Sequence, residues 1–136
     1  MLRTAARVFG FAFVLVGVLG FVPGITRNQM LLGVFHVNAL HNIVHLLSGA
    51  AALAAAASSV NASRTFFRVF GVVYGLVAVL GFVAGDRPVL GLMANNVADT
   101  WLHVAIAAAS LILGFVVKEA PHPETSHPVG PARPAT

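Results

Sequence analysis

The sequence predicts an all-α membrane protein: a bundle of four transmembrane helices built from two tandem helical hairpins that are parallel repeats. Three observations predict this fold. Of the 136 residues, 58% are apolar and only 9% are charged, and the mean hydropathy is +0.89, values far from those of soluble domains. Four stretches each contain the roughly 17–25 mostly apolar residues that a spanning helix needs. Two of these stretches are near copies of each other.

The copied segment supplies the first and third predicted helices, Val8–Ile25 and Val69–Gly85. Residues 7–24 read RVFGFAFVLVGVLGFVPG and residues 68–85 read RVFGVVYGLVAVLGFVAG, so 12 of 18 positions match at an offset of 61. The first segment has the arginines and apolar stretch of a signal peptide. Its copy lies in mid-chain, where nothing is cleaved, so we interpret the first segment as a retained helix. The glycines of both segments allow helices to approach closely in lipid.

A second block, which includes the predicted helices Ala39–Ala57 and Val97–Val117, repeats at an offset of 58. The corresponding positions are Leu32/Leu90, Gly33/Gly91, Asn38/Asn96, His41/Asp99 and His45/His103. Residues 1–117 therefore form one membrane domain with repeat units at about 7–57 and 68–117. Because each unit has two spans, both enter the membrane in the same orientation, which predicts a pseudo-twofold axis along the membrane normal.

The connections differ in composition from the helices. The loops within the hairpins, residues 25–37 and 86–95, each carry an apolar patch that we expect at the membrane interface or folded back over the bundle. The link between the hairpins, Ser58–Thr65, is polar. Residues 118–136 are rich in proline, which predicts a disordered cytoplasmic tail.

The basic residues indicate the orientation. The net charge of +4 is too small an excess to favour a nucleic-acid partner. Six basic residues fall on one side of a four-pass topology, namely Arg3, Arg7, Arg64, Arg68, Lys118 and Arg133. By the positive-inside rule, the N and C termini are both cytoplasmic. Because the chain has no cysteine, any metal site must use nitrogen and oxygen donors.

Polar residues form one stripe on each even helix. On the second helix the stripe contains His41 and His45, and on the fourth it contains Asp99 and His103. These side chains must face protein, because a polar group turned toward lipid costs several kcal/mol. The repeat predicts that His41 meets Asp99 and that His45 meets His103 about 6 Å deeper, one helical turn away.

Two hypotheses follow for this cluster. In the first, His41, His45, Asp99 and His103 bind a metal, because three imidazoles and a carboxylate suit Zn, Cu or non-haem Fe. The side chains of Asn38, Asn42 and Asn96 would then orient the imidazoles. His45 and His103 are also candidate residues for binding haem, a quinone or a pigment.

In the second hypothesis the cluster is an interhelical hydrogen-bond network in a structural or accessory subunit, whose outer loops bind a membrane-protein partner or a second copy of the chain. A proton channel is disfavoured, because titratable groups are found in one leaflet only. An enzyme is also disfavoured, because no Ser or Cys nucleophile and no second intramembrane carboxylate is present.

Two motifs stand at corresponding positions of the repeat: Asn-x-Leu-His-Asn-x-x-His at residues 38–45, and Asn-x-x-Asp-x-x-x-His at residues 96–103. Together with the run from Leu31 to Leu46, they resemble a bacterial family of small four-helix membrane proteins catalogued as a domain of unknown function. The likeness covers about residues 7–117. It implies a bacterial cytoplasmic (inner) membrane location and four spans, and it supplies no activity. More loosely, the fold is similar to small four-helix proteins of the DoxX type.

Overall fold

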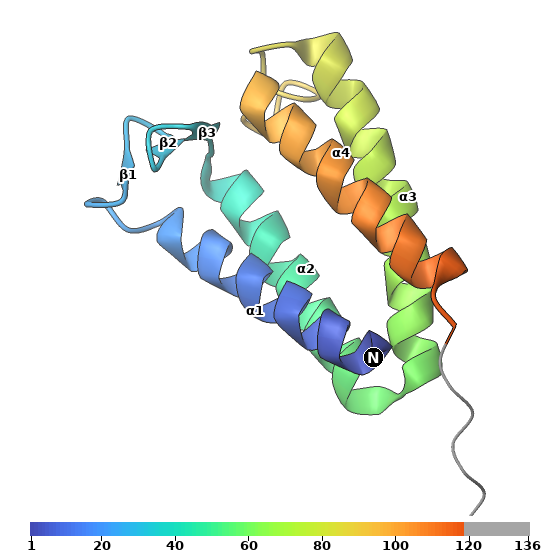
Figure 1. Cartoon of the computed structure of the whole chain (residues 1–136). Helices are drawn as coiled ribbons and strands as arrows, with labels where there is room; N and C mark the ends of the chain where they lie inside the picture. Colours follow the sequence, from blue (N-terminus) through green and yellow to red (C-terminus); the bar gives the residue numbers. More distant parts are fainter. Residues whose placement is uncertain (119–136) are drawn as a thin grey trace, which may run out of the picture.

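The computed structural model describes residues 1–118, which form two helical hairpins (Figure 1). The first hairpin pairs α1 with α2, and the second pairs α3 with α4. The helices are α1 (Leu2–Leu19), α2 (Ala39–Ser58), α3 (Val60–Ala84) and α4 (Val97–Leu111), which continues into a π-helical turn at Ile112–Val116. The predicted all-α bundle is confirmed. Of the predicted tail, only Lys118 belongs to the described residues.

All four helices are long and apolar enough to cross a membrane, so the protein is a multi-pass membrane protein. Many large apolar side chains, such as Leu47, Val83 and Phe115, are exposed. Both hairpin loops lie at one end, which we call the loop end (Figure 1). The N-terminus and the α2–α3 connection lie at the opposite end, which we call the terminal end.

At the terminal end the helices are longer than the sequence predicted. α1 begins at Leu2 instead of Val8, and α3 begins at Val60 instead of Val69. The predicted polar link at 58–65 is therefore wrong, because only Ser59 separates α2 from α3. Ser59 ends one helix and begins the next, and its side chain accepts the backbone N–H of Ala62 at 3.0 Å.

Arginine side chains explain why these extra turns are helical. Arg3 Nε donates to the carbonyl of Ala56 at 2.8 Å, in the last turn of α2. Arg68 Nε donates to the carbonyl of Gly114 at 2.8 Å, and Arg64 donates to Val117 at 2.7 Å, both at the end of α4 and its π-helical turn. The last carbonyls of a helix have no intrahelical partner, so each guanidinium satisfies an acceptor of the neighbouring helix end and holds the extra turn against it.

The first loop contains a small antiparallel sheet that the sequence did not predict. Its strands are β1 (Thr26–Arg27), β2 (Met30–Leu31) and β3 (Phe35–His36), in the order β1-β2-β3. Asn28 and Gln29, both at positive φ, form the two-residue turn between β1 and β2. Backbone groups near the membrane need partners, and the sheet supplies them.

The second loop repeats part of this geometry. The bridge between Val89 and Met93 corresponds, at the offset of 58, to the pairing of Leu31 with Phe35. Leu32 and Leu90 both have a φ of 53°. The glycines that follow them also have positive φ. In each loop the apolar patch divides, because Leu31 and Val89 are buried whereas Leu32 and Leu90 are exposed.

Within each hairpin a glycine brings the two helices together. A Cβ added at Gly10 of α1 would lie 2.6 Å from the side chain of Leu53 on α2. A Cβ at Gly71 of α3 would lie 2.8 Å from the side chain of Leu111 on α4, the corresponding position. Aromatic rings pack between the hairpins, with Phe13 5.2 Å from the ring centroid of Phe70. The middle of the bundle is thus closely packed beneath the polar stripes.

Candidate metal centre

The N-termini of α2 and α4 are fixed by two equivalent asparagines. Asn38 Oδ1 accepts the backbone N–H of His41, and Asn96 Oδ1 accepts that of Asp99, each at 2.9 Å. Each amide also reaches the opposite loop: Asn38 Nδ2 donates to the carbonyl of Leu92, and Asn96 Nδ2 donates to that of Val34, each at 2.8 Å. The two hairpins therefore hold each other through matched bonds.

His41 and Asp99 also make corresponding bonds to the opposite loop. His41 Nδ1 lies 2.9 Å from the carbonyl oxygen of Ala94. The carboxylate of Asp99 accepts the backbone N–H of His36, which occupies the position in the first loop that matches Ala94, at 2.9 Å. The same place in the fold thus carries a side-chain donor in one hairpin and a side-chain acceptor in the other.

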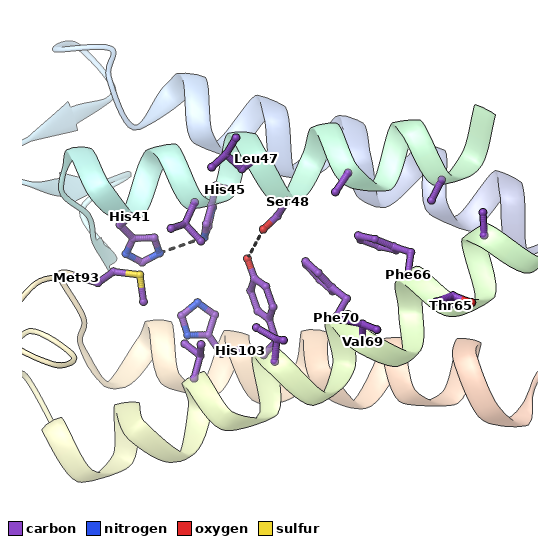
Figure 2. Close-up of a pocket in the computed structure, with 17 residues that line it drawn as sticks. His41, His45, Leu47, Ser48, Thr65, Phe66, Val69, Phe70, Met93 and His103 are labelled. Carbon is purple, nitrogen blue, oxygen red and sulfur yellow. Dashed lines mark hydrogen bonds between the residues drawn. The ribbon is translucent and has the colours of Figure 1, made fainter. Parts of the chain in front are cut away.

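Three buried histidines meet between α2 and α4. One nitrogen from each of His41, His45 and His103 can be chosen so that all three lie within 4.8 Å of one another. Figure 2 shows the three imidazoles pointing toward one another from the two helices. His41 Nε2 and His45 Nε2 are 3.1 Å apart. For comparison, two nitrogens bound to one tetrahedral zinc at about 2.05 Å are about 3.3 Å apart.

The bond to Ala94 determines the tautomer of His41. A carbonyl oxygen only accepts, so Nδ1 carries the proton and Nε2 presents its lone pair toward His45. This is the arrangement found around metal-bound histidines, in which the second ring nitrogen donates to a carbonyl or carboxylate.

His103 has an unused nitrogen. Its ring is 3% exposed, and Nδ1 has no hydrogen-bond partner among the described residues. Leaving a buried polar atom unpaired costs about 1–3 kcal/mol. A ligand on this imidazole would remove that cost.

Aromatic rings hold the two deeper histidines at equivalent places. Phe13 of α1 lies 5.2 Å from the ring of His45, and Tyr74 of α3, at the corresponding position, lies 5.5 Å from the ring of His103. The Tyr74 hydroxyl is 3.2 Å from Ser48 Oγ on α2. Tyr74 was not among the predicted site residues, although it is the one tyrosine in the sequence and replaces a phenylalanine in the copied segment.

Asp99 is used differently from the predicted pairing with His41. Its carboxylate accepts the N–H groups of His36 and Asn96, the latter completing a capping box at the start of α4. Among residues 1–118, the hydrogen bonds of His41 and Asp99 do not join the two side chains. Each side chain instead bonds the backbone of the opposite loop, His41 at Ala94 and Asp99 at His36.

The three asparagines predicted to orient the imidazoles have other contacts. Asn38 and Asn96 cap helices and bind the opposite loops, as described above. Asn42 is buried against α1, where a Cβ added at Gly20 would collide with its side chain. The orienting contact of the cluster comes instead from a main-chain carbonyl, that of Ala94, which no side-chain pattern could reveal.

The cluster opens into a groove between α2 and α3 with a volume of about 710 Å³. Met93, from the second loop, lines it together with the three histidines, and Figure 2 shows the side chain of Met93 pointing toward the space between His41 and His103. Asn95, also unpredicted, is buried beside this loop and donates to the carbonyl of Gly85 at 2.7 Å. It ties the loop to the end of α3.

Fold and site together define a class: a small four-helix membrane protein with a buried cluster of three histidines near one end of the bundle. Comparison with protein families places the chain more narrowly. Residues 3–116 match the family described as a domain of unknown function, DUF4383, and the chain belongs to this family, as the motifs predicted. No match was found among curated proteins or among solved structures.

Proposed function

We propose that the protein binds a transition-metal ion within the membrane through His41, His45 and His103. The observation that carries this proposal is the convergence of three buried imidazole nitrogens within 4.8 Å. Two details support it: the carbonyl of Ala94 leaves the lone pair of His41 Nε2 facing the cluster, and His103 Nδ1 is unpaired among the described residues. Asp99 is not assigned as a ligand, because its carboxylate already accepts two backbone N–H groups.

The donor set favours copper or zinc. Three neutral imidazoles suit Zn and Cu, and the thioether of Met93 is a soft ligand that selects Cu(I). Non-haem Fe(II) sites normally add a carboxylate to their histidines, and Asp99 is otherwise engaged. We therefore propose copper first and zinc second, ahead of iron or haem.

Metal titration tests this function. The full chain in mild detergent is titrated with Cu(I) and with Zn(II) against a competing chelator. The variant His103→Ala should bind at least about 100-fold more weakly, since removal even of an orienting partner costs 10–100-fold. His36→Ala is the matched control, because His36 is half-buried beside the cluster but outside it, and this variant should bind as the wild type does. Equal affinities for wild type and His103→Ala would overturn the proposal.

A structural role is the alternative, and one observation favours it. The 3.1 Å contact between His41 Nε2 and His45 Nε2 is a hydrogen bond that needs no metal. In that case the cluster fixes the register of α2 and α4, and the exposed loop residues Leu32 and Leu90 bind a membrane partner or a second copy of the chain. His103→Ala would then lower the thermal unfolding midpoint while metal content stays at zero in both proteins.

We also propose that the two hairpins, about 7–57 and 68–117, are copies of one unit related by a pseudo-twofold axis along the membrane normal. The matched bonds of Asn38 and Asn96 support this relation. The location proposed is the bacterial cytoplasmic membrane, with both termini in the cytoplasm. Its support is the set of arginines at the terminal end, Arg3, Arg7, Arg64 and Arg68.

A further inference from the structure

Two grooves run along the bundle at corresponding places. The larger, between α2 and α3, has a volume of about 710 Å³, and the smaller, between α1 and α4, has about 290 Å³. Val8, Phe9, Ala12, Phe13 and Val16 line the smaller groove, and their counterparts at the offset of 61, Val69, Phe70, Val73, Tyr74 and Val77, line the larger. The two grooves are therefore lined by equivalent residues, and the positions at which they differ indicate what kind of molecule each groove can bind.

The main chemical difference is a pair of hydroxyls. Tyr74 and Ser48 lie in the larger groove, 3.2 Å apart. Phe13 and Ile106 occupy the corresponding positions of the smaller groove. A bond between two hydroxyls uses one donor and one acceptor, which leaves one O–H and further lone pairs available to a third group. The larger groove thus has a pair of hydroxyl groups that the smaller one lacks.

The depth of this pair restricts the chemistry of an occupant. Ser48 is nine residues into α2, roughly 14 Å from the start of that helix, near the middle of a hydrocarbon layer about 30 Å thick. A charged lipid headgroup is not stable at that depth. An acyl chain would have no partner for the hydroxyls. A neutral ring that carries oxygen atoms satisfies both conditions.

The two ends of the groove match such a molecule. At the loop end, the imidazoles of His41, His45 and His103 line the groove and offer flat surfaces against which a ring can pack. Toward the terminal end the α2 wall consists of small alanines and the α3 wall of Phe70, Phe66 and Thr65, so the groove becomes mostly apolar (Figure 2). From His41 to Ala55 it extends about 21 Å along α2, enough for an isoprenoid tail.

We propose that the groove between α2 and α3 binds a membrane quinone, with an oxygen of the ring bonded to the Tyr74–Ser48 pair, the ring lying beside the imidazole of His103, and the tail lying between the alanines of α2 and Phe66 of α3. This site does not require that the histidines hold a metal. It goes beyond the proposed metal function and is tested separately.

Thermal stabilisation by decylubiquinone tests the proposal. A ligand that binds only the folded state stabilises it by RT ln(1 + [L]/Kd), so the unfolding midpoint rises with the logarithm of ligand concentration once that concentration exceeds Kd. The full chain in mild detergent is heated with increasing decylubiquinone, and with decanol as a tail without a ring. The test variant is Tyr74→Phe/Ser48→Ile, which copies the smaller groove into the larger. The matched control is Phe13→Tyr, which adds a hydroxyl at the corresponding position of the smaller groove.

Wild type and Phe13→Tyr should be stabilised by decylubiquinone and not by decanol, and the double variant should need at least about tenfold more quinone for the same shift. If the double variant does not fold, the single change Tyr74→Phe, which removes one oxygen, should show a weaker response. Metal content is measured on the same samples and should be the same in all of them, which separates this result from the metal proposal. Equal stabilisation by decanol, or an unchanged quinone response in the variants of the larger groove, would overturn the proposal.

Discussion

The two hairpins make hydrogen bonds at corresponding positions, but the side chain donates in the first hairpin and accepts in the second. In the first hairpin His41 donates to the carbonyl of Ala94, and in the second Asp99 accepts the N–H of His36. Each of these side chains fixes its own hairpin to the loop of the other hairpin. Only the histidine leaves a second nitrogen free to face His45 and His103. Symmetry therefore accounts for the scaffold, whereas the difference at this one pair of positions accounts for the cluster.

Removing Asp99 should have the largest effect on stability. Asp99→Ala leaves the N–H groups of His36 and Asn96 without their acceptor, and we expect a loss of about 2–4 kcal/mol. His41→Ala should cost less, because its bonds to the carbonyl of Ala94 and to His45 Nε2 join neutral groups, whereas those of the Asp99 carboxylate are charge-assisted. Thermal unfolding in mild detergent compares the two variants. If His41→Ala lowered stability more than Asp99→Ala does, the Asp99 carboxylate would not be the stronger of the two contacts with the opposite loops.

Substitutions at the glycines of α1 and α3 test how closely the helices pack within each hairpin. Gly10→Val should destabilise by about 1–3 kcal/mol, because even the first carbon of the new side chain would overlap Leu53. Gly75→Ala should be neutral or slightly stabilising, since its Cβ would meet only Ala107, at 3.9 Å. The same unfolding experiment measures both. A cost for Gly75→Ala as large as that for Gly10→Val would contradict the packing.

Met93 and Phe35 occupy corresponding positions in the two loops. Met93→Phe copies the first loop into the second and removes the one thioether seen beside the histidines. We expect Cu(I) affinity to fall about tenfold and Zn(II) affinity to change little, because a thioether is a ligand for soft ions. Competition titration measures both affinities. Equal losses for the two metals would mean that Met93 acts by shaping the loop.

Removing the asparagine caps should lower stability by less than removing Asp99. Asn38→Ala and Asn96→Ala each remove a cap and a bond to the opposite loop, so each should lower stability by about 1–2 kcal/mol. Asn96→Ala should cost slightly more, because it also breaks the capping box with Asp99. Matched unfolding curves would show this order. Widely different losses of stability for the two variants would indicate that the two loops are not equivalent.

The sequence predicted the fold best where local signals are strong. The starts of α2 at Ala39 and of α4 at Val97 agree with prediction, because an asparagine cap precedes each. The starts of α1 and α3 were missed, because the arginines that look like the end of an apolar span are helical and bind the carbonyls of a neighbouring helix. That contact is tertiary and leaves no local pattern.

The cluster was predictable in part for the same reason. Helical spacing and the repeat brought His41, His45 and His103 together. The role of Asp99 was missed because it is the third residue of α4, where a capping box competes for the carboxylate. Its second partner is the backbone of His36, 63 residues away. Met93 and Tyr74 could be recognised only once the groove between α2 and α3 was formed.

The most direct test of the central claim is the metal content of the full chain purified in mild detergent, measured by elemental analysis together with an absorption spectrum. The wild type should carry close to one copper or zinc ion per chain, and the double variant His45→Ala/His103→Ala should carry none while remaining folded. If the wild type carries no metal, or if the double variant retains it, the three histidines are not a metal centre.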